Sequence, residues 1–313
     1  MIPSVNMQRF HHLQFADFAR LLELKQCNRQ RISVCIPTLN EAETIGSIVS
    51  IIREELVSKA GLVDEILVID SNSDDATLKI AQDAGATAYL SSELAPETGS
   101  HLGKGENLWK GLHVATGDII CYIDGDISNF HPRFITGLIG PLLTDPSIDY
   151  VKAFYERPLD CGESKLANSG GRVTEILIRP LISLFYPELS TVLQPLAGEY
   201  AARRSIFESL PFPVGYGVEI AHLIDLAGAG RQKNIAQTDL VKRIHRNRDD
   251  DELGQMSFAI LQVILRRLER DGKLTLSSPL PDLYQSWVVD GEHIQPITRH
   301  IPEPERPPLN PRF

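Results

Sequence analysis

The chain has 313 residues, of which 42% are hydrophobic and 23% charged, and it carries a net charge of −10 at pH 7. This length predicts a substantial core, and the acidic balance argues against a nucleic-acid-binding protein or one that docks on an anionic membrane. Two of the four cysteines, Cys35 and Cys121, lie in apolar runs where a free thiol packs as a small hydrophobe. No segment approaches eighteen apolar residues and the first residues lack a signal-peptide core, so we expect a cytoplasmic protein.

The first half of the chain alternates apolar strands with amphipathic helices. The chain opens with a lead-in that contains a short helix at "FADFARLLELK". We then expect apolar strands, most of them followed by a polar turn, in the segments "RISVCIPTLNE", "DEILVIDSNSDDA", "ATAYLS" and "DIICYIDGD". Between them lie the predicted helices "TIGSIVSIIREELVSKAG", "ATLKIAQDAG" and "GKGENLWKGLHVATG". The alternation predicts a mostly parallel, Rossmann-like α/β sheet with helices on both faces.

The second half has a mixed pattern. We expect strands at "YVKAFYERP" and "NIAQTDLVKRIHRNR", and helices at "GGRVTEILIRPLISLFY" and "DDDELGQMSFAILQVILRRLERDG". The last helix has a broad apolar surface, which predicts packing against a second subunit and hence a homodimer. The tail "PEPERPPLNPRF" is too proline-rich for regular structure and should be extended. Because no repeat or hinge-like linker appears, we expect one domain with a C-terminal extension.

Two carboxylates, Asp124 and Asp126, follow a buried strand with only Gly125 between them. The ends of three strands ("PTLNE", "DSNSDD" and "DGD") should line one crevice, because ligands of open α/β sheets bind beyond the carboxyl ends of the strands. Asp124 and Asp126 could form a polar turn, but crowded carboxylates are better explained by a cation that neutralises them.

The same strand ends hold candidates for binding a flat polar ring such as uracil. The backbone of Thr38 and Leu39 and the side chain of Glu41 could do so, or "PTLNE" could only cap the next helix. Asp70 and Ser71 allow the same two interpretations.

Two glycine-flanked helix starts could bind anions. Lys104, between two glycines, is either a solvated side chain or a neighbour of a pyrophosphate. The segment from Asn168 to Arg172, with Thr174 in the first turn, is either an N-cap or a cradle for a phosphate or carboxylate.

The most basic stretch is "VKRIHRNRDDDE". In an extended segment Arg243, His245 and Asn247 share one face. A charge run is often only solvated surface, but His245 and Asp126 could together ligate Mg²⁺ or Mn²⁺ while the arginines neutralise a diphosphate.

Together these segments resemble the nucleotide-sugar glycosyltransferases of the GT-A fold, and more closely the retaining glucosyl-3-phosphoglycerate synthases. The resemblance runs from about residue 30 to about residue 270. Its collinear segments are "PTLNEAETI", "DSNSDDAT", "GKGENLW", "IDGDISNFHP", "GGRVTE", "QPLAGEYAARR", "GYGVEI" and "HRNRDDDELGQM". It implies a nucleotide-sugar-binding part at 31–150 and an acceptor-binding part of the same domain at 151–270, with a lead-in at 1–30 and a C-terminal tail at 271–313.

The resemblance implies transfer of glucose from UDP-glucose to D-3-phosphoglycerate with Mg²⁺ or Mn²⁺. It implies a donor site formed by Pro37, Thr38, Leu39, Glu41, Ser71, Lys104, Asp124, Gly125, Tyr216, Arg243 and Arg248. It implies an acceptor site formed by Gly171, Arg172, Thr174 and Asn247. The metal would be held by Asp126 and His245, with Asp124 facing metal or ribose, and Gly125 stands where the family usually has serine.

For catalysis the resemblance implies roles for Asp126, Arg248 and Glu219. Arg248 and the metal would stabilise the departing UDP, and the acceptor hydroxyl would attack from the face that the diphosphate leaves. Glu219 as a covalent nucleophile is the alternative. Other activities remain open from sequence: a mannosyl-3-phosphoglycerate synthase using GDP-mannose, a lipid-phosphate sugar transferase, and a non-catalytic nucleotide-binding scaffold. An NAD-dependent dehydrogenase is disfavoured because no G-x-G-x-x-G follows the first strand.

Overall fold

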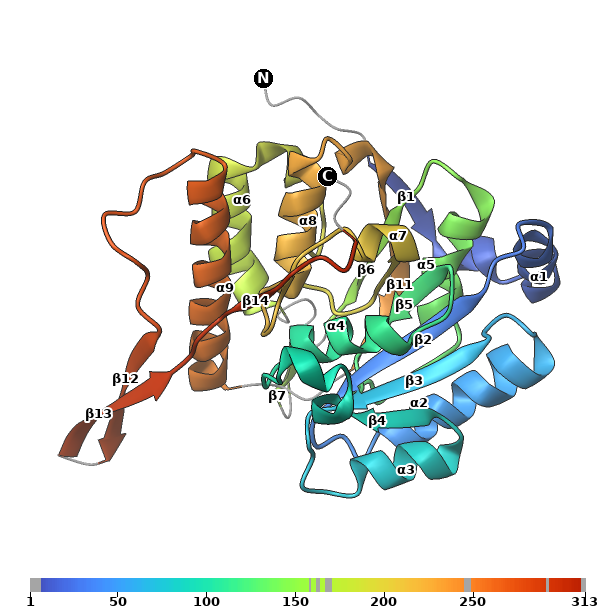
Figure 1. Cartoon of the computed structure of the whole chain (residues 1–313), viewed down its shortest axis with the longest axis horizontal. Helices are drawn as coiled ribbons and strands as arrows, with labels where there is room; N and C mark the ends of the chain where they lie inside the picture. The colour runs from blue at the N-terminus through green and yellow to red at the C-terminus, as the bar shows by residue number, and fades with distance from the viewer. Residues whose placement is uncertain are drawn as a thin grey trace.

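The central feature is an eight-stranded sheet with the strand order β1-β11-β6-β9-β5-β2-β3-β4 (Figure 1). The structure, a computed structural model, describes residues 7–157, 159–161, 164–166, 171–244, 249–290 and 293–310. The strands of this sheet are β1 (Gln8–His11), β2 (Ile32–Thr38), β3 (Glu65–Asp70), β4 (Thr87–Leu90), β5 (Ile119–Tyr122), β6 (Tyr150–Glu156), β9 (Tyr200–Arg203) and β11 (Ile235–Lys242). Neighbouring strands run parallel except at β9, which is antiparallel to both β5 and β6. The predicted mostly parallel α/β sheet is therefore confirmed.

Helices cover both faces of this sheet, as the alternating pattern predicts. They are α1 (Phe18–Cys27), α2 (Ile45–Ile51), α3 (Thr77–Ala84), α4 (Lys104–Val114), α5 (Arg133–Thr144), α6 (Arg179–Phe185), α7 (Arg204–Phe207), α8 (Val218–Gly228) and α9 (Asp250–Arg270). Two π-helical stretches, η2 (Ile52–Lys59) and η5 (Thr174–Ile178), adjoin α2 and α6. Short 3₁₀ turns are η1 (His12–Phe15), η3 (Ser91–Glu93), η4 (Pro96–Thr98), η6 (Pro187–Leu189) and η7 (Gln232–Asn234). No helix among the described residues is long and apolar enough to cross a membrane.

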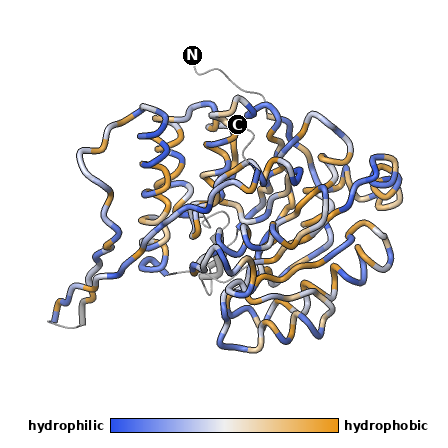
Figure 2. Tube along the Cα trace, in the orientation of Figure 1, coloured by the Kyte–Doolittle hydropathy of each residue, from blue (hydrophilic) through white to orange (hydrophobic). Residues whose placement is uncertain are grey.

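Two apolar clusters form the core, one on each face of the sheet. The first packs α1, α2, α3 and α5 against side chains such as Val34 and Ile36, and the second packs α4, α6, α8 and α9 against the intervening Cys35. Because successive strand residues point to opposite faces, the centre of β2, from Val34 to Ile36, is apolar on both faces. Cys35 and Cys121 are both buried, which confirms the expectation that these thiols act as core residues. In Figure 2 the central strands carry much of the hydrophobic colour, whereas the C-terminal tail is largely hydrophilic.

Both ends of the chain take part in the architecture. Residues of the predicted lead-in form the edge strand β1, which pairs with β11. In the tail a hairpin of β12 (Leu283–Asp290) and β13 (His293–His300) projects from the body, as Figure 1 shows. The tail then returns, and β14 (Glu305–Arg306) pairs with β10 (Phe212–Pro213). A further small hairpin joins β7 (Leu159–Cys161) and β8 (Ser164–Leu166).

Candidate active site

The polar ends of β2 and β3 lie side by side, as expected for strand ends that line one crevice at the sheet edge. Thr38 and Asp70 are paired in register, and Thr38 Oγ1 donates to Asp70 Oδ1 at 2.8 Å. Asp70 Oδ2 also accepts from the backbone N–H of Ser73 at 2.7 Å, so Asp70 orders the turn. Leu39 beyond them is 54% exposed and available to a ligand. The edge therefore combines a turn-forming carboxylate with exposed groups that can face a base.

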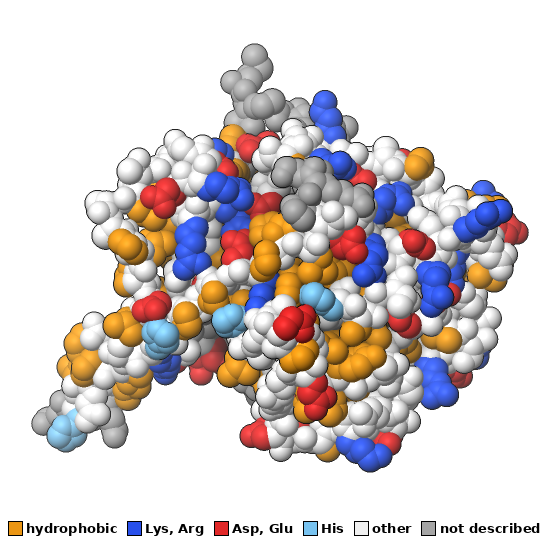
Figure 3. All heavy atoms as spheres, viewed as in Figure 1, with side chains coloured by type: hydrophobic (Ala, Val, Ile, Leu, Met, Phe, Trp, Pro, Cys, Tyr) orange, Lys and Arg blue, Asp and Glu red, His pale blue; other side chains and the backbone are white. Residues whose placement is uncertain are grey.

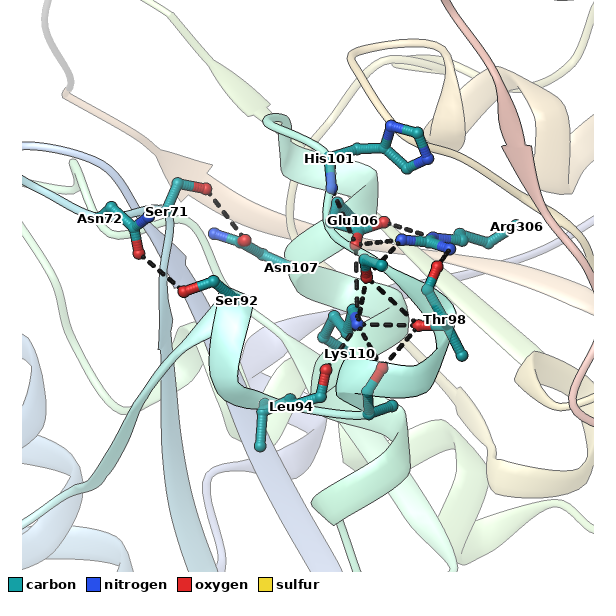
Figure 4. A network of polar contacts seen from close by, with 12 residues as sticks. Ser71, Asn72, Ser92, Leu94, Thr98, His101, Glu106, Asn107, Lys110 and Arg306 are labelled. Atoms are coloured by element: carbon teal, nitrogen blue, oxygen red, sulfur yellow. Dashed lines mark hydrogen bonds and ion pairs between the residues drawn. The ribbon is translucent and has the colours of Figure 1, made fainter.

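Ser71 is tied to helix α4 through a residue that sequence reasoning missed, Asn107. Ser71 Oγ lies 2.9 Å from Asn107 Oδ1, and Asn107 Nδ2 donates to the carbonyl of Ile69 at 2.8 Å (Figure 4). Asn107 stands one helical turn after Lys104, and this spacing on a site helix was the available signal. Helix α4 thus aligns two donor-site segments.

Lys104 is the first residue of α4, and the glycines on both sides let this helix start pack against another backbone segment. A Cβ at Gly105 would lie 1.8 Å from the carbonyl oxygen of Pro213, and Gly103 adopts a φ of +148°. Lys104 Nζ then contacts Asp124 at 2.5 Å and Glu219 at 2.7 Å. Burial alone would lower the pKa of Lys104, but the charges of Asp124 and Glu219 outweigh it and hold that pKa above its ordinary value. The ammonium group is therefore a fixed charge of the site and not a solvated surface group.

Asp124 and Asp126 converge on one cationic group. Arg243 Nη2 donates to Asp124 Oδ2 at 2.8 Å and to Asp126 Oδ1 at 2.7 Å. Burial would raise the pKa of Asp124, but Lys104 and Arg243 together hold it below its ordinary value. A Cβ at Gly198 would lie 2.0 Å from Asp124 Oδ2, so only glycine leaves room for this carboxylate. Gly125 and Asp126 do lie in a turn, and the two carboxylates are in addition held by ion pairs with Lys104 and Arg243.

Glu199, directly before β9, is a further carboxylate that sequence reasoning did not assign. It is fully buried, its Oε1 lies 2.9 Å from Arg243 Nε, and Tyr155 donates its hydroxyl hydrogen to the other oxygen. Burial raises the pKa of Glu199, and the Arg243 charge opposes the shift. The motif "QPLAGEYAARR" contains Glu199, but its role depends on an arginine more than forty residues away in sequence.

A cavity of about 380 Å³ lies beside Tyr155, the residue that donates to Glu199. It is lined by Phe154, Tyr155, Arg157, Gly171, Thr174, Glu175, Leu193 and Gln194. The predicted acceptor residues Gly171 (φ +96°) and Thr174 (5% exposed) are therefore in one cavity wall. Arg172 lies at the same helix start and forms an ion pair with Asp250 of α9.

Arg157 is a cation of this cavity that sequence reasoning missed. Its Nη2 donates to the Tyr155 hydroxyl at 2.9 Å. Its Nε is buried and has no hydrogen-bond partner among the residues that the structure describes. A guanidinium with an unused buried donor in a cavity wall is suited to bind an anion.

Six charged groups form one connected cluster, which we call the site cluster. Its members are Lys104, Asp124, Asp126, Glu199, Glu219 and Arg243. With four carboxylates and two cations, its formal charge is −2, which a divalent cation would balance. The oxygen donors of Asp124 and Asp126 also fit Mg²⁺ or Mn²⁺.

Three predicted residues, His245, Asn247 and Arg248, lie outside the described residues. No group of three or more His, Cys, Asp or Glu suited to a metal occurs in the described part of the chain. The predicted ligand set is therefore represented here by its two carboxylates.

The family model for glycosyl transferase family 2 matches residues 33–210, a span that includes the ends of β2, β3 and β5. The chain belongs to this family. A protein from Petrotoga mobilis named glucosyl-3-phosphoglycerate synthase is 48% identical over 99% of the chain and 95% of its own length. The predicted resemblance to glucosyl-3-phosphoglycerate synthases and the GT-A fold class are thereby confirmed.

Solved structures of family members superpose on nearly the whole chain. Glucosyl-3-phosphoglycerate synthase from Mycobacterium tuberculosis, in complex with Mn²⁺, uridine-diphosphate and phosphoglyceric acid, has a TM-score of 0.84 and 38% identity. That match covers 98% of this chain and 99% of the other. Mannosyl-3-phosphoglycerate synthase from Rubrobacter xylanophilus has a TM-score of 0.88 and 37% identity, covering 97% of this chain and 95% of the other.

Proposed function

We propose that this protein is a glucosyl-3-phosphoglycerate synthase, which transfers glucose from UDP-glucose to D-3-phosphoglycerate with retention of configuration and needs Mg²⁺ or Mn²⁺. One observation carries the proposal: a continuous line of contacts joins the two predicted substrate sites. It runs from Lys104 through Asp124, Arg243, Glu199 and Tyr155 to Arg157 in the acceptor cavity. A sugar held over the carboxylates would thus lie next to an anion bound in the cavity.

On the donor side, Pro37, Thr38, Leu39, Glu41 and Ser71 would hold the uridine. Thr38 and Ser71 are already ordered by Asp70 and Asn107, so this surface is preorganised. Gly125 lies under Thr38, since a Cβ there would be 3.0 Å from Thr38 Cγ2.

The metal would be held by Asp126 and His245, with Asp124 beside them. When bound, the divalent cation neutralises the diphosphate and so favours departure of UDP. Arg243 fixes the two carboxylates in advance through its paired donation, and Arg248 would add positive charge at the diphosphate. A preorganised charge of this kind stabilises the transition state without rearrangement during the reaction.

Glu219 would face the glucose together with Tyr216, which is 38% exposed. Glu219 is almost fully buried, and Lys104 holds its carboxylate at 2.7 Å. A carboxylate neutralised in this way is a weak nucleophile and a good positioning group. We therefore propose front-face attack by the acceptor hydroxyl, with the departing phosphate accepting its proton.

On the acceptor side, Gly171, Arg172, Thr174 and Asn247 would bind phosphoglycerate. This substrate carries both a phosphate and a carboxylate, so one cation is insufficient for it. We propose that Arg157 supplies the second cation through its unused Nε. The proposed substrates are phosphorylated metabolites, in keeping with a cytoplasmic enzyme.

A donor and acceptor panel tests this function. Purified enzyme is mixed with UDP-glucose, GDP-glucose, GDP-mannose and UDP-galactose, each crossed with 3-phosphoglycerate, 2-phosphoglycerate and phosphoenolpyruvate, with and without Mg²⁺. We expect metal-dependent release of UDP only with UDP-glucose and 3-phosphoglycerate. Preference for GDP-mannose would identify the mannosyl transfer for which the Rubrobacter relative is named, and no turnover with any pair would refute the enzyme proposal.

We also propose that the protein is a homodimer that uses the projecting hairpin together with α9. Leu283, Trp287, Val288 and Ile294 of the hairpin are large apolar residues with exposures of 47–65%. Figure 3 shows the arm extending from the body, with apolar side chains among charged and histidine ones, and a second copy could cover the apolar side chains. We expect a dimeric mass by light scattering, and a monomeric mass after Trp287→Ser combined with Ile294→Ser.

A further inference from the structure

We propose that residues 303–307, here called the strap, position the donor site, with Glu303 and Arg306 as positioning residues. The proposal rests on the proposed function, because the groups that the strap aligns are the proposed donor-site residues. The strap lies at the end of the chain, follows the projecting hairpin and crosses the body toward α4 (Figure 1). Family motifs recognised in the sequence end near residue 270, so nothing in them assigns a role to this segment.

Glu303 holds the loop that leads into α8. Its Oε1 accepts from the backbone N–H of Gly215 at 2.7 Å, and the carbonyl of Pro304 accepts from Val214 N at 3.0 Å. A Cβ at Gly215 would lie 2.3 Å from Glu303 Oε2, so the carboxylate and this loop are in close contact. Glu303 is only 2% exposed although it belongs to a tail of polar composition. The loop it holds continues through Tyr216 to α8, which carries Glu219.

Arg306 holds the first turn of α4. Its Nε and Nη2 donate to the two oxygens of Glu106 at 2.7 and 2.6 Å, a bidentate pair in which Glu106 is fully buried. Arg306 also donates to the carbonyls of Thr98 and Gly99 at 2.7 and 3.0 Å (Figure 4). Removing one partner of a buried bidentate pair leaves an uncompensated charge, so this contact strongly restricts the helix position.

The two contacts of the strap hold the two segments that carry the Lys104–Glu219 ion pair. Glu106 is two residues from Lys104 in α4, and the Glu303 loop leads to Glu219 in α8, which Lys104 contacts at 2.7 Å. Glu106 N also donates to Val214 O at 2.9 Å, so the α4 start and the loop are bonded directly. The strap therefore sets the relative position of two helices whose first turns meet at the proposed donor sugar.

Glu303 also provides a pH readout. Burial raises the pKa of Glu303 to about 7, and the charge of Glu219 in α8 adds to this shift. The N–H groups of Gly215 and Gly217 and the charge of Arg266 in α9 oppose it. As the pH falls through 7, the carboxylate becomes protonated and accepts more weakly from Gly215. A glutamine at this position keeps an acceptor oxygen and has no titration.

The test compares Glu303→Ala and Glu303→Gln with a matched control, Glu305→Ala. Glu305 is in the same strap, but its side chain pairs with Arg267 at 2.6 Å and not with a donor-site segment. We expect Glu303→Ala to raise the KM for UDP-glucose at least tenfold, with the KM for 3-phosphoglycerate within twofold. In wild type, the KM for UDP-glucose should rise as the pH falls below 7, because Glu303 becomes protonated. In Glu303→Gln this KM should stay within threefold of the wild-type value at pH 8, and it should not rise below pH 7. Glu305→Ala should leave both KM values within twofold.

Two results would refute the proposed positioning role of the strap. One is an unchanged donor KM in folded Glu303→Ala, and the other is an equal change in Glu305→Ala, which would mean that tail stability alone matters. Amide hydrogen exchange supplies a measurement without turnover: Gly215 and its neighbours should exchange at least tenfold faster in Glu303→Ala, and at the wild-type rate in Glu305→Ala. If wild type turns over no donor, the proposed function fails, and the exchange rates alone decide for or against the strap. If Glu303→Ala does not fold, the pH profile of Glu303→Gln decides.

Discussion

Replacing Glu219 by glutamine separates the two mechanisms for retention. The substitution preserves the size of a side chain that is 4% exposed and keeps one oxygen to accept from Lys104 Nζ, now at 2.7 Å. What is lost is the negative charge of the acceptor, so an ion pair becomes a hydrogen bond from the ammonium group to a neutral amide oxygen, a difference of about 1–2 kcal/mol. Lys104 keeps its second partner, Asp124, at 2.5 Å. We therefore expect kcat/KM for UDP-glucose to fall by about 5–30-fold.

A covalent nucleophile would give a much larger effect. Loss of such a group lowers kcat by ~10⁴-fold or more. The assay is the initial rate over a range of UDP-glucose at saturating 3-phosphoglycerate, with the anomeric configuration of the product determined by NMR. Asp225→Asn is the matched control, since Asp225 is an acid on the same helix that pairs with Arg267 and lies outside the site cluster. A ~10⁴-fold loss of kcat in folded Glu219→Gln, with Asp225→Asn active, would show that the inferred positioning role is wrong.

The remaining predictions concern the metal, the acceptor and a buried amine. Asp126→Ala and His245→Ala should each abolish metal-dependent turnover with little change in thermal unfolding; metal-stimulated activity in either would contradict the ligand assignment. Arg172→Ala should raise the KM for 3-phosphoglycerate more than tenfold with little effect on the donor KM, and equal rises would argue against its role. Lys152 of β6 is fully buried without a hydrogen-bond partner among the described residues, and burial lowers its pKa to about 7. Above pH 7 the unfolded chain then binds more protons than the folded chain, so the free energy of unfolding should rise between pH 7 and 10 by at most about 4 kcal/mol. Lys152→Met should remove this rise. Urea titrations in which wild type and Lys152→Met show the same dependence of the free energy of unfolding on pH would refute the prediction.

Much of the fold could be predicted because its causes are local. Strands β2, β3 and β5 are mostly apolar since both faces of a parallel sheet are covered, and the chain turns polar where each strand ends. That pattern also predicts that Asp124 and Asp126 lie at the same sheet edge as Thr38 and Ser71. Residues 8–11 gave no such signal, because an edge strand of four residues with half-exposed side chains lacks a clear period.

Site residues with distant partners could not be predicted in this way. Glu199, Asn107 and Arg157 have ordinary local contexts, and each acquires a role from a neighbour brought in by folding. The same holds for Glu303 and Arg306, whose proline-rich surroundings predict an extended tail. The tail is extended, yet its carboxylate and guanidinium are buried against the donor-site segments.

By itself the sequence determined the alternation of strands and helices from β2 to β5, the polar sheet edge and the paired carboxylates of Asp124 and Asp126. Only the tertiary structure decided that Arg243 joins those carboxylates to Glu199, and that the end of the chain contacts both α4 and the loop before α8. The physical reason is that hydrophobic periodicity and turn chemistry act over a few residues, whereas a buried charge takes its partner from whichever segment the packed core places within hydrogen-bonding distance.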